Sequence, residues 1–264
     1  MANKGAKITL YWLEQSRSQR ILWLLEELGL EYDLQTFKRG PNGLAPAELK
    51  QIHPLGKSPV IRVEPEGTGT GTAQPLVLAE SGAIVEYLLD HFLTEETAHL
   101  LPKKWVDGRE GQVGGETEAW TRYRYFLHYN EGTLMTFLII QLVLNKIKSN
   151  SPFFIKPIAN GIVSSVESSY LRPNYDANFA FLEDQLATAP EGGPYLCGAQ
   201  LTAADILMSL PIQAALLRVL DSEKYPRLVA YAERLRGHEA YQRAIKKIEE
   251  VEVMHHEDRL LGKL

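Results

Sequence analysis

Cysteine is nearly absent from this sequence of 264 residues, which contains only Cys197. A single cysteine cannot form an intramolecular disulfide, a Cys-x-x-Cys redox pair or a zinc cage. So little cysteine is typical of proteins from a reducing compartment. Chemistry at paired cysteines is therefore excluded, and we predict that Cys197 is a small buried apolar side chain.

Long hydrophobic runs and an excess of basic residues are also missing. The longest uncharged segment, 132–145, is shorter than the roughly 18 apolar residues of a membrane-spanning helix. There are 28 Lys and Arg residues against 33 Asp and Glu residues, a net charge of −5, so the positive field that nonspecific nucleic-acid binding requires is absent. Residues 1–7 contain no apolar signal-peptide core. We therefore expect a cytoplasmic protein with no integral membrane segment and no nucleic-acid partner.

The composition and the length predict a folded protein with one or two domains. Hydrophobic residues make up 45% and charged residues 23% of the chain, close to the average for globular proteins. Domains contain about 150 residues, so this length predicts two modest domains or one large one. Up to about residue 95, strand and helix patterns alternate in the order βαβ, α, ββα. The strands are expected at 8–13, 32–37, 60–63 and 76–79. The helices are expected from Ser16 or Ser18 to Leu28, at 46–52 and at 81–92.

The connections between these elements predict a mixed four-stranded sheet. The first two strands are joined through a helix and should be parallel, with a right-handed crossover. The last two are joined by a loop and should be antiparallel. That loop contains alternating glycine and threonine at 67–72. It does not lead into a helix, as a phosphate-binding loop must, so we interpret it as a hairpin loop.

Beyond about residue 100, only helical patterns occur. The segment 103–116 is rich in glycine and charge and is interpreted as an extended linker or an insertion. We therefore predict an α/β domain over 1–95 and an all-helical domain over 96–264. Its helices are expected at 116–148, 152–171, 174–187, 203–217, 226–236 and 239–251.

Three short motifs of the first domain could hold a ligand. Pro59 stands at the very start of a strand, where its missing N–H does not interrupt the sheet. The Glu80-Ser81 pair lies where a strand passes into a helix, and the free N–H groups of a helix start attract anions. A third motif, Ser16-Arg17-Ser18-Gln19-Arg20, precedes the first helix.

Together with the element order, these motifs resemble the thioredoxin-like domain of cytosolic glutathione S-transferases. The wider match is most similar to the fungal GTT-type transferases. It includes Lys38-Arg39, Ile52-His53-Pro54-Leu55-Gly56, Leu78-Ala79-Glu80-Ser81-Gly82 and Ala204-Asp205-Ile206-Leu207-Met208-Ser209. The resemblance implies a thioredoxin-like domain followed by a helical bundle, with glutathione as co-substrate and no other cofactor or metal.

The resemblance also assigns roles in glutathione binding. Ser81 would hold the γ-glutamyl carboxylate, and Glu80 would pair with the α-amino group. Pro59 would be cis, so that the backbone of Ser58 pairs with the cysteinyl part like an added strand. Lys57 would reach the glycyl carboxylate.

The resemblance implies that Ser16 is the catalytic residue. Free thiols ionise near pH 8.5, and a hydroxyl beside a helix start can stabilise the thiolate through a charge-assisted hydrogen bond. Counted back from Arg20, Ser16 occupies the place of the serine in serine-type transferases. Ser18 is an alternative, and Tyr11 stands two residues away from the tyrosine of tyrosine-type members. The absence of cysteine from this turn disfavours the omega-like and hydroquinone-reductase branches.

The helical domain offers fewer functional candidates. Tyr123 and His128 on the first long helix are candidates to line an electrophile pocket, with Tyr125 and Tyr129 beside them. Thr202-Ala203-Ala204-Asp205 fits a capping box and is interpreted as structural. The adjacent histidines at 255–256 are interpreted as solvated, and no metal site is predicted.

The composition therefore predicts a cytoplasmic protein, and the resemblance implies a homodimeric detoxification enzyme. It would conjugate glutathione to hydrophobic electrophiles, with reduction of organic hydroperoxides as a possible side activity. The alternative is a non-catalytic protein of the same fold that binds a ligand or regulates a partner.

Overall fold

The computed structural model describes residues 2–67 and 73–260, without the side chains of 254–260. The described residues form two compact units. One contains the residues up to Leu101 together with those from Leu235 onward, and the other is Pro102–Arg234. Most of the predicted glycine-threonine loop and the side chains of the histidine pair at 255–256 lie outside the described residues.

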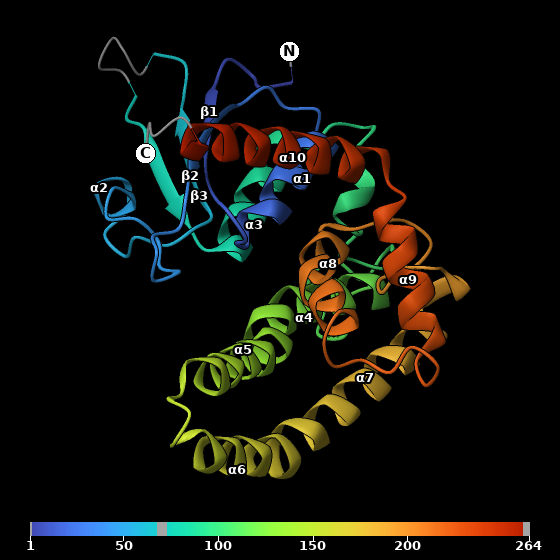
Figure 1. Cartoon of the computed structure of the whole chain (residues 1–264). Helices are drawn as coiled ribbons and strands as arrows, with labels where there is room; N and C mark the ends of the chain where they lie inside the picture. The colour runs from blue at the N-terminus through green and yellow to red at the C-terminus, as the bar shows by residue number, and fades with distance from the viewer. Residues whose placement is uncertain (1, 68–72, 261–264) are drawn as a thin grey trace. The chain divides into compact units, whose positions relative to one another are not determined.

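The first unit contains the predicted mixed sheet, with the strands in the order β2-β1-β3-β4. As predicted, β1 and β2 are parallel, and β3 and β4 are antiparallel. The bounds are β1 Lys7–Leu13, α1 Ser18–Glu27, β2 Asp33–Phe37, α2 Leu49–Ile52, β3 Val60–Glu64, β4 Leu76–Ala79 and α3 Ser81–Phe92 (Figure 1).

The central strand β1 is buried on both faces, which explains its continuous apolar sequence. Ile8, Leu10 and Trp12 are all buried and alternate with the side chains of the opposite face. On that opposite face, Tyr11 and Leu13 pack in a cluster with Leu49 of α2 and Val60 of β3. The turn that directly follows β1 therefore begins from a strand that is held by packing on both faces.

A helix from the end of the chain completes the first unit. Helix α10, Glu239–Leu260, lies along α1 (Figure 1), where the rings of Trp23 and Tyr241 meet edge to face at 5.1 Å. The predicted boundary at 95/96 marks the change from alternating strands and helices to helices alone. The compact units are defined by which residues pack together, not by the type of secondary structure, and they place α10 with the sheet. They therefore do not test this boundary, which stays a prediction.

One buried carboxylate fastens α10 to α1. Glu26 accepts hydrogen bonds from Arg243 Nε at 3.2 Å and Lys247 Nζ at 2.5 Å, and also from the Tyr32 hydroxyl. Burial alone would raise the pKa of Glu26, but the bonds from Lys247 and Tyr32 outweigh burial and lower it. Its side chain is only 9% exposed, so these ion pairs are less screened than surface pairs.

The second unit is helical, as predicted. A short 3-10 turn, Ala98–Leu100, precedes it, and another, Pro190–Gly192, lies within it. The longer elements are α4 Glu118–Tyr129, a π turn Asn130–Leu134, α5 Met135–Asn150, α6 Lys156–Val166, a π turn Glu167–Leu171, α7 Arg172–Ala187, α8 Ala203–Leu216 and α9 Pro226–Arg236. No helix among the described residues is long and apolar enough to cross a membrane.

Two segments of this unit differ from the prediction. The helix break expected between 171 and 174 does not occur, because a π turn comes directly before Pro173 and widens the helix where the proline ring would meet a carbonyl. Of the two interpretations of residues 103–116, the extended linker is wrong and the insertion is not contradicted, because the segment forms a closed loop. Val106 N–H donates to Gly115 O at 2.9 Å, and Thr117 N–H donates to Lys104 O at 2.8 Å.

Candidate functional site

The predicted site residues of the first unit meet at one edge of the sheet. The strand register pairs Tyr11 with Val60 and Val60 with Ala79. The end of β1, the start of β3 and the end of β4 therefore lie side by side. The three predicted motifs, which follow β1, precede β3 and follow β4, are brought together in this way.

Three serine hydroxyls from these motifs form a chain of contacts. Ser16 Oγ lies 2.5 Å from Ser18 Oγ and donates to Ser58 Oγ at 3.5 Å. Ser18 Oγ donates to Leu13 O at 3.3 Å, and Ser58 Oγ donates to Tyr11 O at 3.2 Å. Each hydroxyl has one proton, so those of Ser18 and Ser58 are committed to backbone carbonyls. Of the three, only the Ser16 proton can turn to a ligand without breaking a bond to the backbone.

The environment of Ser16 also differs from those of the two alternatives. Ser18 is fully buried at the first turn of α1, and its oxygen also accepts from Leu13 N–H at 3.3 Å. Tyr11 is 7% exposed, and its ring packs against Phe37 at a centroid distance of 6.4 Å. Ser16 is half-buried, and its oxygen accepts from Ser18 N–H at 3.2 Å. Its side chain therefore supports the start of α1, while its own proton is shared only with the neighbouring serine hydroxyls and not with the backbone.

The second part of the site is the start of helix α3. Glu80 has a φ of 71°, its side chain is exposed, and it makes no bond to the helix end. Ser81 is buried as the first residue of α3. The first N–H groups of a helix have no partner within it and carry partial positive charge. The α3 start can therefore receive a carboxylate, and Glu80 can receive an ammonium group.

The buried side chain of Arg20 orients Ser81. In the sequence, Arg20 served only as the residue from which the position of Ser16 was counted. Arg20 is 1% exposed, and its Nη2 donates to Ser81 Oγ at 3.1 Å. A hydroxyl oxygen that accepts this bond keeps its own proton for another acceptor. The sequence signal is an arginine directly before the apolar run 21–25 of α1.

The third part of the site is the turn before β3. The Ser58–Pro59 peptide bond is cis, as the resemblance implies. Pro59 is buried, whereas the side chain of Lys57 is exposed. Gly56 has a φ of 56°, and a Cβ there would lie 2.7 Å from Lys50 Cγ. Any other residue directly before Lys57 would therefore be strained, a constraint that sequence reasoning missed.

In the helical unit, the structure separates the two predicted pocket residues. His128 lines a cavity of about 450 Å³ with Arg124, Tyr125, Tyr129, Gly132 and Thr133, whereas Tyr123 is only 1% exposed. The rings of Tyr125 and Tyr129 stack at 5.5 Å, and Tyr129 OH donates to Asn178 Oδ1 at 2.5 Å. Burial raises the pKa of Tyr129, which keeps its hydroxyl protonated.

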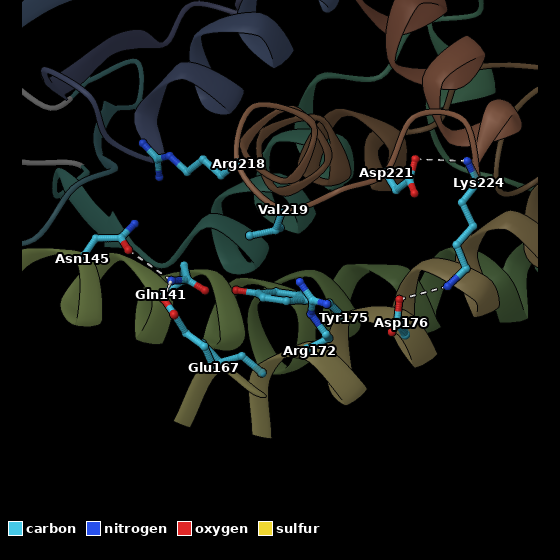
Figure 2. Close-up of a pocket in the computed structure, with 11 residues that line it drawn as sticks. Gln141, Asn145, Glu167, Arg172, Tyr175, Asp176, Arg218, Val219, Asp221 and Lys224 are labelled. Atoms are coloured by element: carbon cyan, nitrogen blue, oxygen red, sulfur yellow. Dashed lines mark hydrogen bonds and ion pairs between the residues drawn. The ribbon is translucent and has the colours of Figure 1, made fainter. Parts of the chain in front are cut away.

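A larger cavity of about 650 Å³ in the same unit was not predicted (Figure 2). Its acidic side chains are held by neighbouring donors. Glu167 accepts from Lys148 Nζ at 2.8 Å and from Gln141 Nε2 at 2.7 Å, and Asp176 pairs with Lys224 at 3.1 Å. This arrangement balances charge and presents no nucleophile beside a base.

Asp205 and Cys197, which the sequence singled out, are both buried in the helical unit. Asp205 is fully buried and accepts four hydrogen bonds: from Thr202 N–H and Oγ1, Leu196 N–H and Tyr231 OH. Burial raises its pKa, although the bonds from Thr202 and Tyr231 act in the opposite direction. Cys197 is buried, and burial raises the pKa of its thiol. Neither side chain is available to a ligand.

Comparisons with known proteins agree with this geometry. Residues 16–91 match the family model described as Glutathione S-transferase, N-terminal domain. Glutathione S-transferase 1 of Saccharomyces cerevisiae is 35% identical over 242 residues, which cover 91% of this chain and 94% of the yeast protein. Glutathione S-transferase 3 of Schizosaccharomyces pombe is 28% identical over 243 residues, 92% of this chain and 88% of that protein. The crystal structure of a glutathione S-transferase from Actinobacillus pleuropneumoniae is 32% identical, with a TM-score of 0.62, and the match covers 91% of this chain and 92% of that one.

Proposed function

Since this chain belongs to the glutathione S-transferase family, with fungal members among its relatives, we propose that it binds glutathione and activates it as a thiolate for conjugation to hydrophobic electrophiles. The observation that carries the proposal is the Ser16 hydroxyl at the sheet edge, whose proton, unlike those of Ser18 and Ser58, is not held by a backbone carbonyl. On this proposal the chain is a serine-type transferase.

Ser16 acts by stabilising negative charge on sulfur. Its hydroxyl donates to the thiolate in place of the long contact to Ser58 Oγ. A hydrogen bond to a charged acceptor is about twice as strong as a neutral one, so it favours the ionised thiol. Ser16 does not need to remove the proton itself, because a thiol of lowered pKa loses it to water.

The rest of the site holds the ends of the tripeptide. The γ-glutamyl carboxylate lies at the start of α3 and accepts from Ser81, whose proton is left free by Arg20. Glu80 pairs with the α-amino group, and the backbone of Ser58 pairs with the cysteinyl part. Lys57 is exposed and reaches the glycyl carboxylate.

The role of Glu80 is tested by Glu80→Gln. Because the Glu80 side chain is exposed and does not cap α3, the melting temperature should not change. Losing the charged partner of the amino group costs about 1.5 kcal/mol, so the Kd of glutathione in calorimetry should rise about tenfold. A glutathione analogue without the α-amino group should bind both proteins equally well. Equal affinity of the two proteins for glutathione itself would contradict this assignment.

The electrophile is proposed to be apolar and to bind near His128. The cavity that His128 lines has a wall of stacked aromatic rings, and Tyr123 is buried and lines neither cavity of this unit. A thiolate that attacks carbon can also attack the oxygen of an organic hydroperoxide, which breaks the O–O bond and releases the alcohol. A second glutathione then converts the sulfenic acid to glutathione disulfide and water, so reduction of hydroperoxides is proposed as a side activity. We further propose that this activity serves detoxification and that the protein is cytoplasmic.

Retention on immobilised glutathione, followed by turnover assays, tests the proposed function directly. The retained protein should conjugate a generic aromatic electrophile and consume an organic hydroperoxide. Retention with no turnover of any electrophile would favour a non-catalytic binding protein. No retention and no calorimetric binding would contradict the proposal.

We also propose that the protein is a homodimer, as the resemblance implies. The support is an exposed apolar surface on α5, α6 and the segment between them. Its members are Ile139, Leu142, Val143, Ile147, Phe153, Phe154, Ile155, Ile158 and Ile162. Those of α5 and α6 recur at helical spacing and so share a face of each helix. Large exposed apolar patches mark interfaces between proteins.

The dimer is tested by light scattering on the double variant Ile158→Glu/Ile162→Glu. The wild type should have twice the mass of the 29.7 kDa chain, and the variant should have the mass of one chain, because two buried charges would oppose association. Val113→Glu, at a fully exposed position outside this surface, is the control and should stay dimeric. A wild type with the mass of one chain at micromolar concentration would contradict the proposal.

A further inference from the structure

Arg39 makes an unusual set of hydrogen bonds with the turn that carries Ser16. It lies two residues beyond the end of β2. Its Nε donates to Glu14 O at 3.1 Å and its Nη2 to Gln15 O at 3.0 Å. Its backbone N–H donates to Glu14 Oε1 at 2.8 Å. The remaining guanidinium nitrogen, Nη1, donates to Gly43 O at 3.1 Å.

These bonds fix two consecutive peptide groups directly before Ser16. Across a trans peptide bond, the C=O of one residue and the N–H of the next point in opposite directions. Because Arg39 holds the carbonyls of Glu14 and Gln15, the N–H groups of Gln15 and Ser16 point away from it. The orientation of the Ser16 backbone is therefore set from the β2 side of the sheet.

The turn needs such support, because its backbone is strained. Gln15 has a φ of 48°, in the left-handed region that non-glycine residues rarely adopt and that costs about 1 kcal/mol or more. A planar guanidinium can hold three carbonyls in fixed directions, whereas a lysine ammonium is a point charge on a flexible stem.

We propose that Arg39 is the positioning residue that fixes the Ser16 hydroxyl at the sulfur of bound glutathione, and so sets the acidity of that thiol. The inference rests on the proposed function. Arg39 touches neither the sulfur nor Ser16 Oγ. It acts through the peptide groups of Glu14 and Gln15, and its loss would let the turn relax and move the hydroxyl out of reach of the thiolate.

The test is an ultraviolet titration of bound glutathione, with steady-state kinetics, in Arg39→Ala. We expect the thiol pKa to rise by about one unit, which lowers the thiolate fraction and kcat about tenfold below that pKa. Activity should recover in alkaline buffer, and KM should change less than about twofold. Guanidinium ion at millimolar concentration should partly restore the thiol pKa, which a general loss of stability would not allow.

Arg39→Lys and Arg62→Ala complete the experiment. Arg39→Lys keeps the charge and provides a second variant if Arg39→Ala does not fold; it should show a smaller rise in the thiol pKa. Arg62 is a half-exposed arginine of the same sheet, paired with Glu64 at 2.8 Å, and Arg62→Ala should titrate like the wild type. A folded Arg39 variant with the wild-type thiol pKa would overturn this inference alone. A wild type that binds no glutathione would contradict the proposed function as well.

Discussion

Ser16→Ala is expected to raise the pKa of bound glutathione by one to two units and to lower activity near pH 6.5 by about 10-fold to 100-fold. A hydrogen bond to a charged group contributes about 1.5–3 kcal/mol, and one pKa unit corresponds to about 1.4 kcal/mol. The ionised thiol loses this bond in the variant and the neutral thiol does not. Activity should therefore recover as the pH rises through the new pKa, and glutathione affinity at low pH should change little.

Three further variants test whether Ser16 stabilises the thiolate or only supports the start of helix α1. Ser16→Thr keeps the hydroxyl and should keep most of the shift in thiol pKa. Ser18→Ala removes a buried hydroxyl that binds the backbone of Leu13 and should cost about 1 kcal/mol of stability, with the thiol titration unmoved. Tyr11→Phe should also titrate like the wild type. Superimposable thiol titrations of wild type and Ser16→Ala would remove Ser16 from the catalytic role.

Asp205→Ala is expected to lower the free energy of unfolding by about 4 kcal/mol. The substitution leaves two N–H and two O–H donors without their acceptor in a fully buried place. Each such buried donor costs about 1–3 kcal/mol, and relaxation recovers part of the sum. Urea unfolding followed by circular dichroism measures the loss as a lower midpoint with an unchanged slope.

Two other substitutions calibrate this loss. Tyr231→Phe removes one donor and leaves none unpaired, so it should cost about 1 kcal/mol. Asp221 also accepts a backbone bond, from Glu223 N–H at 3.1 Å, but it is exposed, and Asp221→Ala should cost less than about 1 kcal/mol. If Asp205→Ala were no more destabilising than Asp221→Ala, the Asp205 network would not be a main support of the helical unit.

The elements of the first unit are predictable because local patterns specify them. The apolar run of β1 and the helical spacing of Ile21, Leu24 and Leu28 identify a strand and a helix without knowledge of the rest of the chain. The bounds of β4 and α3 are found to the residue. The π turns and the closed loop at 103–116 were not predicted, because they depend on hydrogen bonds that no local periodicity announces.

The sequence by itself determined the family, the mixed sheet, the helical second part and the residue types of the site, because short motifs and their order carry this information. Only the tertiary structure decided which serine hydroxyl is free of a bond to a backbone carbonyl and which arginines bond to the turns of the site. Ser58 meets the carbonyl of Tyr11 across 47 residues, and Arg39 meets Glu14 across 25. A hydrogen bond needs both partners at about 3 Å with the correct direction, and for residues this far apart in the chain only the folded sheet brings them there.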